Sequence, residues 1–361
     1  LSNNVVIRSC LFTDSGFNTS DYTAIYGYAE RMLVERCKFV VAASRDNPMT
    51  GIAVEVHGAF STVRDCEVFG LSMGILICDN YVATVYDISV YGNYIEAFTC
   101  PIGFFRIANL AVPTSLSGIA IYDNLIRLIS GISLNNLAYG IGMYTVDRTV
   151  SNIQIFNNSI TNFKGNSVNV TGIFCGSYNP LESYIVDRLS VENNSVNSFT
   201  TGIEFYIGTG GLGGADIGSI YIDGNNLTNI VTTAAAARGF GVFIQDNSTV
   251  ASPFLYLQIT NNHVQSSDIC IYLRNAEVTT YDVNDNTLQT IAANAYFEQS
   301  TTVTLRYGRK SAISYDSAAP TTGLWRIGDI VYNTAPASAG YIGWVCTVAG
   351  TPGTWKTFGL I

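Results

Sequence analysis

The sequence predicts an all-β fold of stacked, repeating coils, followed by a small β-rich C-terminal segment. The first observation behind this prediction is the composition: 31 Asn, 33 Gly and 22 Tyr accompany only 12% charged residues, which is typical of many strands and tight turns. The second is a short unit that recurs ten times between residues 7 and 288. The third is a Gly-led apolar run that follows most of these units.

The recurring unit consists of an apolar residue, two variable residues, Cys or Asn, one variable residue and a second apolar residue. Its central residues are Cys10, Cys37, Cys66, Asn93, Asn124, Asn158, Asn194, Asn225, Asn262 and Asn286. No unit can bury its apolar side alone, so we expect the units to stack as coils with neighbouring strands about 4.8 Å apart. One polar side chain per coil can then form a ladder that satisfies buried backbone groups at a turn.

The spacing of the central residues varies from 24 to 37, which indicates turns of variable length. This irregularity argues against a leucine-rich repeat, whose period is steadier at about 20–29 residues, and the Trp–Asp signature of a β-propeller is absent. Cys10, Cys37 and Cys66 occupy the place that Asn takes later in the chain. We therefore expect them to be small buried thiols and not disulfide partners.

The composition also excludes several classes of partner. The 18 basic and 27 acidic residues give a net charge of −9, which argues against nucleic-acid binding. No uncharged apolar run reaches the roughly 18–20 residues that cross a bilayer, and no signal peptide is recognisable, so we expect no membrane insertion. No His, Cys or carboxylate cluster has metal-ligand spacing, and no phosphate loop is present, so neither a metal nor a cofactor is expected.

The Gly-led runs predict the face on which chemistry could occur. Side chains alternate along a strand, so after each Gly the first and third residues should face the core and the second and fourth should face outward. The outward residues are then Ala53 and Glu55, Leu76 and Cys78, Gly142 and Tyr144, Phe174 and Gly176, Glu204 and Tyr206, Phe243 and Gln245, and, in the coil near Ile269, Cys270, Tyr272 and Arg274.

This outward face carries a predicted aromatic stripe. Its members are Tyr144, Phe174, Tyr206, Phe243 and Tyr272. Aromatic rings pack against the apolar faces of sugars and their polar edges form hydrogen bonds, so the stripe indicates a glycan-binding surface. Two other interpretations stay open: the rings could stack between coils as ordinary strand formers, or they could contact a partner subunit.

Glu204 is the one carboxylate within the stripe. Glycoside hydrolysis usually needs two carboxyl groups, one acid and one base or nucleophile. The candidates for the second are Asp246, Asp147 and Asp216. Asp246 also has the sequence context of a turn cap. Glu55 with Asp79, towards the other end of the stack, is the runner-up pair.

A lyase would instead need a base that takes the proton beside a uronate carboxylate, and a cation that neutralises that carboxylate. Residues that could serve are Arg274, Arg238, Arg148 and Tyr206. The chain has two histidines, His57 and His263. Because His263 directly follows Asn262 of the repeat, we expect a structural role for it.

The ten units resemble the coils of the right-handed parallel β-helix in the pectate-lyase-like superfamily, over about residues 1–310. In that family the Asn ladder lies in the tight turn between the second and third strands of each coil. The resemblance implies that the Gly-led runs form the first strand, along which sugar is often bound. The fold itself hosts lyases, hydrolases, epimerases and non-enzymes, so it does not decide the function.

The C-terminal segment, residues 311–361, lacks the ladder and contains all three Trp of the chain, Trp325, Trp344 and Trp355. We expect short antiparallel strands joined by turns. The runs GDIVYN and IGWVCTVAGTPGTWKTFG resemble the ending of many bacteriophage tailspike and tail-fibre proteins.

Together the two resemblances imply a phage tailspike depolymerase that cleaves a bacterial surface polysaccharide, capsule or lipopolysaccharide O-antigen, as a glycosidase. They also imply a homotrimer on the virion tail, folded in the host cytoplasm and joined to the rest of the tail by an N-terminal part that is missing here. Three alternatives are a glycan-binding tail fibre without catalysis, a polysaccharide lyase acting by β-elimination, and a structural stem.

Overall fold

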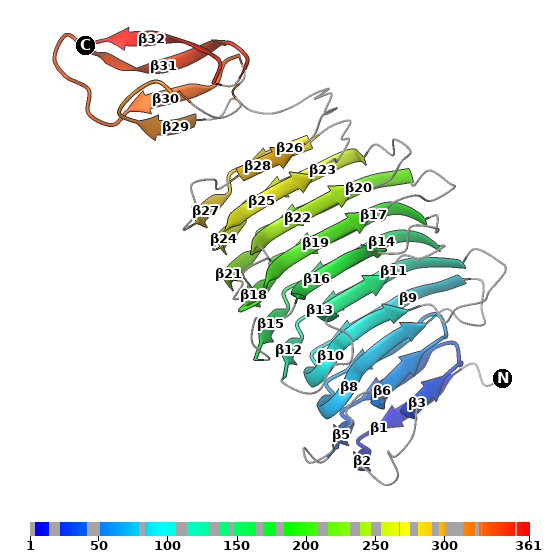
Figure 1. The fold of residues 1–361 in the computed structure, drawn as a ribbon. Coiled ribbons are helices and arrows are strands. Elements are labelled where there is room, and N and C mark those ends of the chain that lie inside the picture. Colours follow the sequence, from blue (N-terminus) through cyan, green and yellow to red (C-terminus); the bar gives the residue numbers. More distant parts are fainter. Residues whose placement is uncertain are drawn as a thin grey trace. The chain divides into compact units, whose positions relative to one another are not determined.

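A computed structural model confirms the predicted parallel β-helix and the small C-terminal β unit (Figure 1). The structure describes residues 4–13, 22–41, 51–78, 84–105, 114–129, 137–144, 148–163, 169–177, 184–207, 216–231, 239–246, 254–266, 268–274, 281–290, 296–299, 313–321, 325, 327–350 and 352–361. The chain divides into two compact units, Leu1–Arg306 and Tyr307–Ile361. Within the described part, no helix is long and apolar enough to span a bilayer.

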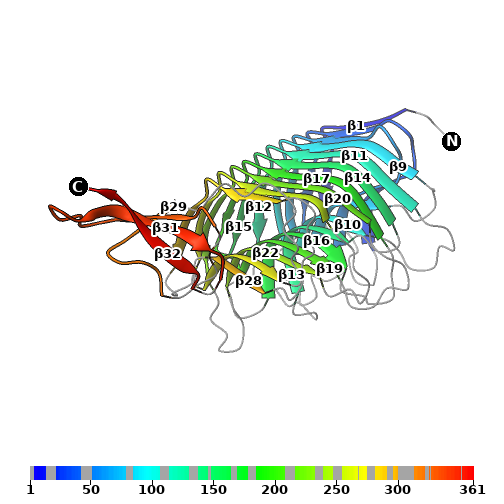
Figure 2. The same cartoon turned by 90° about the horizontal axis from the view of Figure 1, so that it is seen from above.

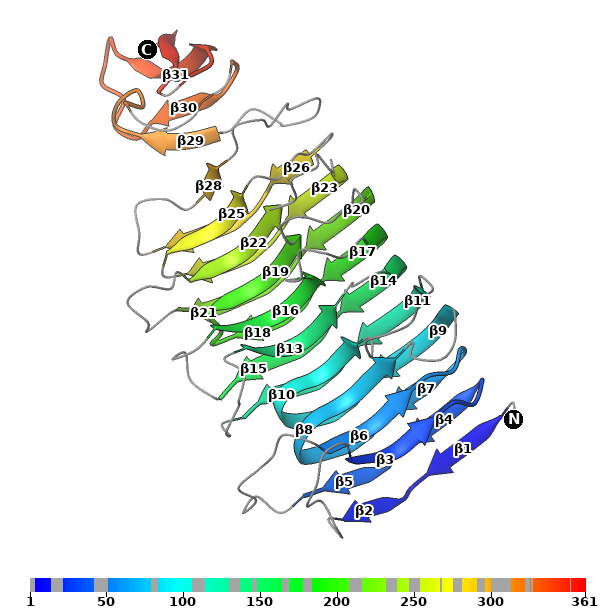
Figure 3. The same cartoon turned by 45° about the vertical axis from the view of Figure 1, so that its right-hand side comes forward.

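One wall of the β-helix is a ten-stranded parallel sheet in which each coil contributes one strand. Its strands, in spatial order, are β1 (Val5–Arg8), β4 (Met32–Glu35), β7 (Thr62–Arg64), β9 (Thr84–Tyr91), β11 (Thr114–Tyr122), β14 (Arg148–Phe156), β17 (Tyr184–Glu192), β20 (Asp216–Asp223), β23 (Phe254–Thr260) and β26 (Tyr281–Asn284). These strands precede the ladder turns and lie side by side along the stack (Figures 1 and 3).

The strands that follow the ladder turns form the next wall, again with parallel pairing. They are β2 (Leu11–Thr13), β5 (Lys38–Val40), β8 (Glu67–Cys78), β10 (Tyr94–Phe105), β12 (Leu125–Leu128), β15 (Ser159–Asn162), β18 (Ser195–Asn197), β21 (Asn226–Ile230), β24 (His263–Ser266) and β27 (Thr287–Thr290). Strands β8 and β10 continue without a break into the third wall.

The third wall contains the Gly-led runs, and we call it the site sheet. It consists of β3 (Tyr22–Gly27), β6 (Gly51–Val56), the ends of β8 and β10, β13 (Leu137–Tyr144), β16 (Asn169–Ser177), β19 (Thr201–Ile207), β22 (Phe240–Asp246), β25 (Ile269–Arg274) and β28 (Tyr296–Gln299). Figure 2 shows the site sheet and the ten-stranded sheet as separate walls of the stack.

The core between the walls contains rows of aligned apolar side chains, and some of these rows are entirely β-branched. Register places in one buried row Val34, Val63, Val90, Ile121, Ile155, Val191, Ile222 and Ile259. β-Branched residues suit this position because they pack well on a pleated, fully buried surface.

The ladder has the geometry that the repeat predicts. The Asn158 side-chain amide donates to the Ile121 and Phe156 carbonyls, both at 3.0 Å, and to Asn194 Oδ1 on the next coil at 2.9 Å. The same pattern recurs at the buried Asn124, Asn194, Asn225 and Asn262. Each of these asparagines therefore donates to backbone carbonyls of its own coil and of the preceding coil. It also donates to the side-chain amide oxygen of the asparagine on the next coil.

The residue before every ladder position has a left-handed backbone, with φ between 52° and 67°. These residues are Ser9, Arg36, Asp65, Gly92, Asp123, Asn157, Asn193, Gly224, Asn261 and Asp285. Gly, Asn and Asp adopt this conformation at the least cost, which explains why they predominate there.

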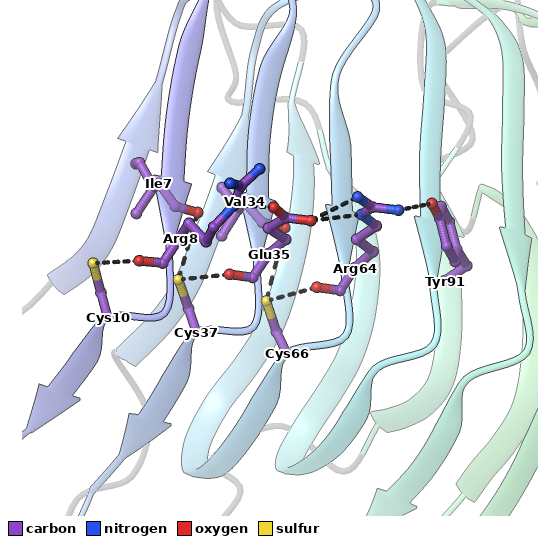
Figure 4. A network of polar contacts seen from close by, with 9 residues as sticks. All are labelled: Ile7, Arg8, Cys10, Val34, Glu35, Cys37, Arg64, Cys66 and Tyr91. Carbon is purple, nitrogen blue, oxygen red and sulfur yellow. Dashed lines mark hydrogen bonds and ion pairs between the residues drawn. The ribbon is translucent and has the colours of Figure 1, made fainter.

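The predicted thiol ladder is confirmed for two of its three members. Cys37 and Cys66 are buried, and their Sγ atoms donate to the Glu35 and Arg64 carbonyls at 3.4 and 3.2 Å (Figure 4). Burial raises the pKa of Cys66 to about 12, which keeps it a neutral thiol. Cys10 is exposed, contrary to the prediction, because it lies in the first described coil.

Beside the thiols, three charged side chains form a network across the first three coils (Figure 4). The buried Glu35 accepts hydrogen bonds from Arg8 and from Arg64, whose Nη2 lies 2.6 Å from Oε2. Arg64 Nη1 donates to the Tyr91 hydroxyl at 3.0 Å. Burial acts to raise the pKa of Glu35, but the hydrogen bonds and charges of Arg64 and Arg8 outweigh it and hold that pKa below its ordinary value.

The C-terminal unit is a four-stranded sheet of β29 (Ile313–Asp316), β30 (Ile330–Asn333), β31 (Tyr341–Val348) and β32 (Thr354–Leu360). The pairs β30–β31 and β31–β32 are antiparallel, as expected, whereas β29 and β30 are parallel. Trp325 packs edge-on against Trp355, with ring centroids 4.9 Å apart.

Replacing Asn194 with Leu should destabilise the β-helix strongly. Leu removes hydrogen bonds to the Ile155 carbonyl, the Asn158 backbone N–H and two neighbouring ladder amides, and each orphaned buried group costs about 1–3 kcal/mol. Unfolding rates in denaturant would measure the loss. The neighbouring exposed Asn226 supplies the control, since Asn226→Leu leaves the ladder intact; equal rates for both variants would contradict this register.

Glu35→Gln should alter the dependence of stability on pH. A lowered pKa gives stability that is present above the ordinary value of 4.5 and is lost as pH falls through the lowered pKa. Wild type should therefore unfold more slowly than Glu35→Gln near neutral pH, and the difference should shrink below that value. Glu67→Gln, at an exposed pair with Lys38, is the control. A difference in unfolding rate between wild type and Glu35→Gln that stays constant with pH would contradict the lowered pKa of Glu35.

Candidate functional site

The position of the Gly in each Gly-led run is set by close packing inside the site sheet. A Cβ on Gly172 would lie 2.6 Å from the Gly202 carbonyl oxygen and 2.3 Å from Val196 Cγ1. Register places small residues at the equivalent position in other coils: Ala53, Gly74, Gly140, Gly202, Gly241 and Cys270. The Gly–Ile signature thus marks a point where a larger side chain would clash with the neighbouring coil.

This register corrects two of the expected outward residues. Ala53 and Cys270 lie in the main core and do not face outward. Each takes the place that Gly holds in neighbouring coils, and Cys270 Sγ donates inward to the Val264 carbonyl at 3.6 Å. Gly51 therefore lies before the strand position that Gly occupies in the neighbouring coils, and Ala53 takes that position instead. Glu55 keeps its outward position.

The outward residues of the site sheet form two rows that run along the stack. The first outward row contains Tyr26, Glu55, Leu76, Gly103, Gly142, Phe174, Glu204, Phe243 and Tyr272. The second outward row includes Tyr144, Gly176, Tyr206, Gln245 and Arg274. The predicted aromatic stripe is thus divided between two rows.

Glu204 lies in the first outward row between two aromatic clusters. The first cluster contains Cys100, Tyr139 and Phe174, and the second contains Phe243, Ile269 and Tyr272. Phe174 and Phe243 are the register neighbours of Glu204 on either side. The Thr171 hydroxyl donates to Glu204 Oε2 at 2.9 Å. Glu204 is therefore a carboxylate with only 8% exposure, flanked by rings and held by a hydroxyl.

The three rings nearest to Glu204 in the first row, Phe174, Phe243 and Tyr272, are buried, which differs from an exposed stripe. Phe174 is 0% exposed, and Phe243 and Tyr272 stack 5.2 Å apart with nearly parallel rings. The second row is more accessible, because Tyr206 is partly exposed and Arg274 is exposed. Alternation along the strand could not distinguish the two rows, since it predicts direction and not depth. The side chain of Tyr144 lies outside the described residues.

In backbone register, neither Asp246 nor Asp216 is a direct neighbour of Glu204. Asp246 pairs with Ile207, three residues further along the strand than Glu204, which corresponds to about 10 Å. Asp216 begins β20 in the ten-stranded sheet and not in the site sheet. Asp147 lies outside the described residues.

A second acid centre lies on the same row, around Glu55. Glu55 Oε1 accepts a hydrogen bond from the Thr23 hydroxyl at 2.9 Å, and Oε2 lies 3.1 Å from His57 Nε2. Glu55 and His57 are both buried. Asp79, the partner expected from sequence, lies outside the described residues. Glu55 and Glu204 are five coils apart, about 24 Å, so they do not share one catalytic pair.

The two acid centres share one local arrangement that sequence reasoning missed. Thr23 lies three residues before Tyr26, the register neighbour of Glu55, and Thr171 lies three residues before Phe174, the register neighbour of Glu204. The signal in the sequence is Thr, two residues and an aromatic ring on one coil, then Glu on the next. It becomes visible only once the register between coils is known.

The cations considered for a lyase are spread over different walls. Arg274 lies on the second outward row, two coils from Tyr206, whereas Arg148 begins β14 in the ten-stranded sheet. Arg238 lies outside the described residues. His263 is exposed at the start of β24, directly after the ladder. Among the described residues, no cluster of His, Cys, Asp and Glu could hold a metal ion.

Comparison with known proteins gives one structural similarity. No model of a protein family matches the chain, and no curated protein matches it. A tailspike protein mutant of E. coli bacteriophage HK620 is similar in structure, with 12% sequence identity and a TM-score of 0.46. The similarity covers 81% of this chain and 51% of that chain, so the present chain spans about half the length of the tailspike structure.

Truncating the two aromatic rows should have different effects on stability. Phe174→Ala empties a fully buried site in the first row and should cost about 3–5 kcal/mol, measured from unfolding in denaturant. Tyr206→Ala, in the partly exposed second row, should cost much less. Equal losses would mean that the two rows are not buried to different depths.

Proposed function

We propose that this chain is the polysaccharide-binding part of a phage tailspike, and that it cleaves a bacterial surface polysaccharide on the outward face of the site sheet by glycoside hydrolysis. The observation that supports this most is the position of Glu204, a nearly buried carboxylate that lies between aromatic clusters and two residues before the partly exposed Tyr206. Apolar walls around a carboxyl group are the setting in which glycosidases hold a general acid.

The second outward row is the proposed contact surface for the sugar chain. Tyr206 offers an aromatic face to the apolar side of a sugar ring, and Arg274 offers donors to hydroxyl or acidic groups. Gln245, between them in register, is buried and can fix the orientation of a ring hydroxyl. The polymer would then lie along the stack and meet one coil after another.

Hydrolysis needs a second carboxyl group, for which we keep Asp246 as the first candidate. Its strand neighbours that of Glu204, and its offset of three residues separates the two backbones by more than a retaining pair would need. This spacing favours an inverting mechanism, with Glu204 as acid and Asp246 as the base that activates water. Asp147 and Asp216 are the alternatives.

A lyase is the second candidate, because Tyr206 and Arg274 share the second outward row. A tyrosine can move the proton in β-elimination while an arginine neutralises the uronate carboxylate. The products separate the two reactions: hydrolysis gives new reducing ends without an unsaturated uronate, and elimination gives the ultraviolet absorbance of that group.

Attachment to the virion tail and assembly as a homotrimer are part of this proposal. They rest on the resemblance of the C-terminal runs to tailspike endings. The expected host-facing location follows from them, as does contact with the rest of the tail through a further N-terminal part. A capsule or an O-antigen would serve equally as the polysaccharide.

Glu204→Gln tests the catalytic role. It keeps the shape and the hydrogen bond from Thr171 but removes the ionisable group, so cleavage should fall by at least about 10²-fold while binding persists. A panel of purified capsular and O-antigen polysaccharides supplies substrates, and reducing ends supply the readout. Glu67→Gln, an exposed carboxylate on β8, is the matched control. Cleavage by Glu204→Gln at the wild-type rate would refute the role of Glu204. If the wild-type protein binds a polysaccharide but does not cleave it, the chain is a glycan-binding fibre without catalysis.

A further inference from the structure

The Glu55 centre contains polar groups that the stack itself does not require. On the next coil, Leu76 is the register partner of Glu55, and Ile77 is the register partner of Val56. His57 follows Val56 and Cys78 follows Ile77, so Cys78 is the equivalent of His57 on that coil. Leu76 and Cys78 are buried and apolar. Because one coil satisfies these positions with apolar side chains, the buried acid and imidazole of the preceding coil need another reason.

His57 is the most constrained member of the centre. It is 0% exposed, and with Glu55 ionised its Nε2–H donates to the carboxylate. Its Nδ1 is buried and, among the described residues, has no hydrogen-bond partner. An unsatisfied buried nitrogen is a feature that stacked coils would be expected to lose unless it serves a function.

Two tyrosines cover this imidazole and reach the surface. The His57 ring lies 4.5 Å from the Tyr28 ring, nearly parallel to it, and 4.7 Å from the Tyr26 ring. The two rings meet at 70°, and their hydroxyl oxygens are 2.7 Å apart. Tyr26 is 47% exposed, so it presents both ring surface and hydroxyl to solvent.

We propose that Tyr26 is a second glycan-binding site, which holds the same polysaccharide chain six coils, or about 29 Å, from Glu204 along one outward row. This inference rests on the proposed function. The exposed ring offers an apolar face and the paired hydroxyls offer donors and acceptors, which is the chemistry that recognises a sugar. Tyr28 and His57 contact the Tyr26 ring, and Glu55 holds His57 and accepts a hydrogen bond from Thr23, so these four are positioning residues.

Two sites on one polymer predict an affinity that depends on chain length. A chain long enough to reach both sites binds the second one as an intramolecular event, whereas a short fragment meets only one site. The length dependence should therefore disappear when the Tyr26 ring is removed.

The test compares long polysaccharide with its short fragments in the Glu204→Gln background, so that the polymer stays intact. The probe is the capsular or O-antigen polysaccharide that most retards the migration of the wild-type protein in affinity electrophoresis. Tyr26→Ala should weaken binding of the long polymer roughly fivefold and bring it close to that of the fragments. Undiminished binding of the long polymer would overturn the second site, while the cleavage result for Glu204→Gln would still decide the proposed function separately.

The positioning residues are tested with side chains taken from the next coil. The double variant Glu55→Leu, His57→Cys copies Leu76 and Cys78, so it should fold with unchanged unfolding rates yet lose the long-polymer preference as Tyr26→Ala does. The single variant Glu55→Gln can still accept hydrogen bonds from Thr23 and His57, so it should keep the preference for the long polymer. If the double variant binds as wild type does, the buried pair does not position Tyr26. If no polysaccharide in the panel binds wild type, both proposals are wrong.

Discussion

The structure depends on the hydrogen-bonded ladder at one turn of every coil. Each ladder asparagine bonds its own coil, the preceding coil and the following coil, and the residue before it takes a left-handed backbone. This arrangement fixes where one strand ends and the next begins in every coil, whatever the length of the other turns. Coils of 24 to 37 residues can therefore share one register, because the ladder holds the strands and the remaining turns absorb the difference.

A common register has a functional consequence, because it converts residues about thirty positions apart into immediate neighbours. Phe174, Glu204 and Phe243 lie side by side only because three successive coils are aligned. A slip of one residue would move Glu204 into the core and bring Phe205 to the outward face. The same alignment places Tyr26 and Glu204 on one outward row, so the two proposed glycan-binding positions lie on the same side of the stack. A linear ligand suits this protein because its surface repeats in one dimension.

Three buried glutamates illustrate how the surroundings decide the role of a carboxylate. Glu35 lies between Arg8 and Arg64, so its charge is matched by the fold and its role is structural. Glu204 and Glu55 lie on the outward row, each held by one threonine hydroxyl, with aromatic rings or an imidazole beside them. Both lie on the outward side of the site sheet, which is why Glu204 is the candidate for contact with a substrate and Glu55 the candidate for positioning Tyr26. The Tyr91, Tyr122 and Phe156 rings continue the Glu35 row as a stack, which indicates that aromatic rows also have a purely structural use here.

The sequence alone determined the coils, the ladder and the direction of most side chains, because these depend on short-range signals: a repeated Cys or Asn, a turn residue before it, and alternation along each strand. It also placed Glu204 among aromatic residues. Only the tertiary structure decided depth and partnership. The buried state of Phe174, the inward position of Ala53 and Cys270, and the pairing of Glu55 with Thr23 and His57 all depend on register between coils. Register is set by contacts between residues about thirty positions apart, and a linear pattern read within one coil does not contain that information.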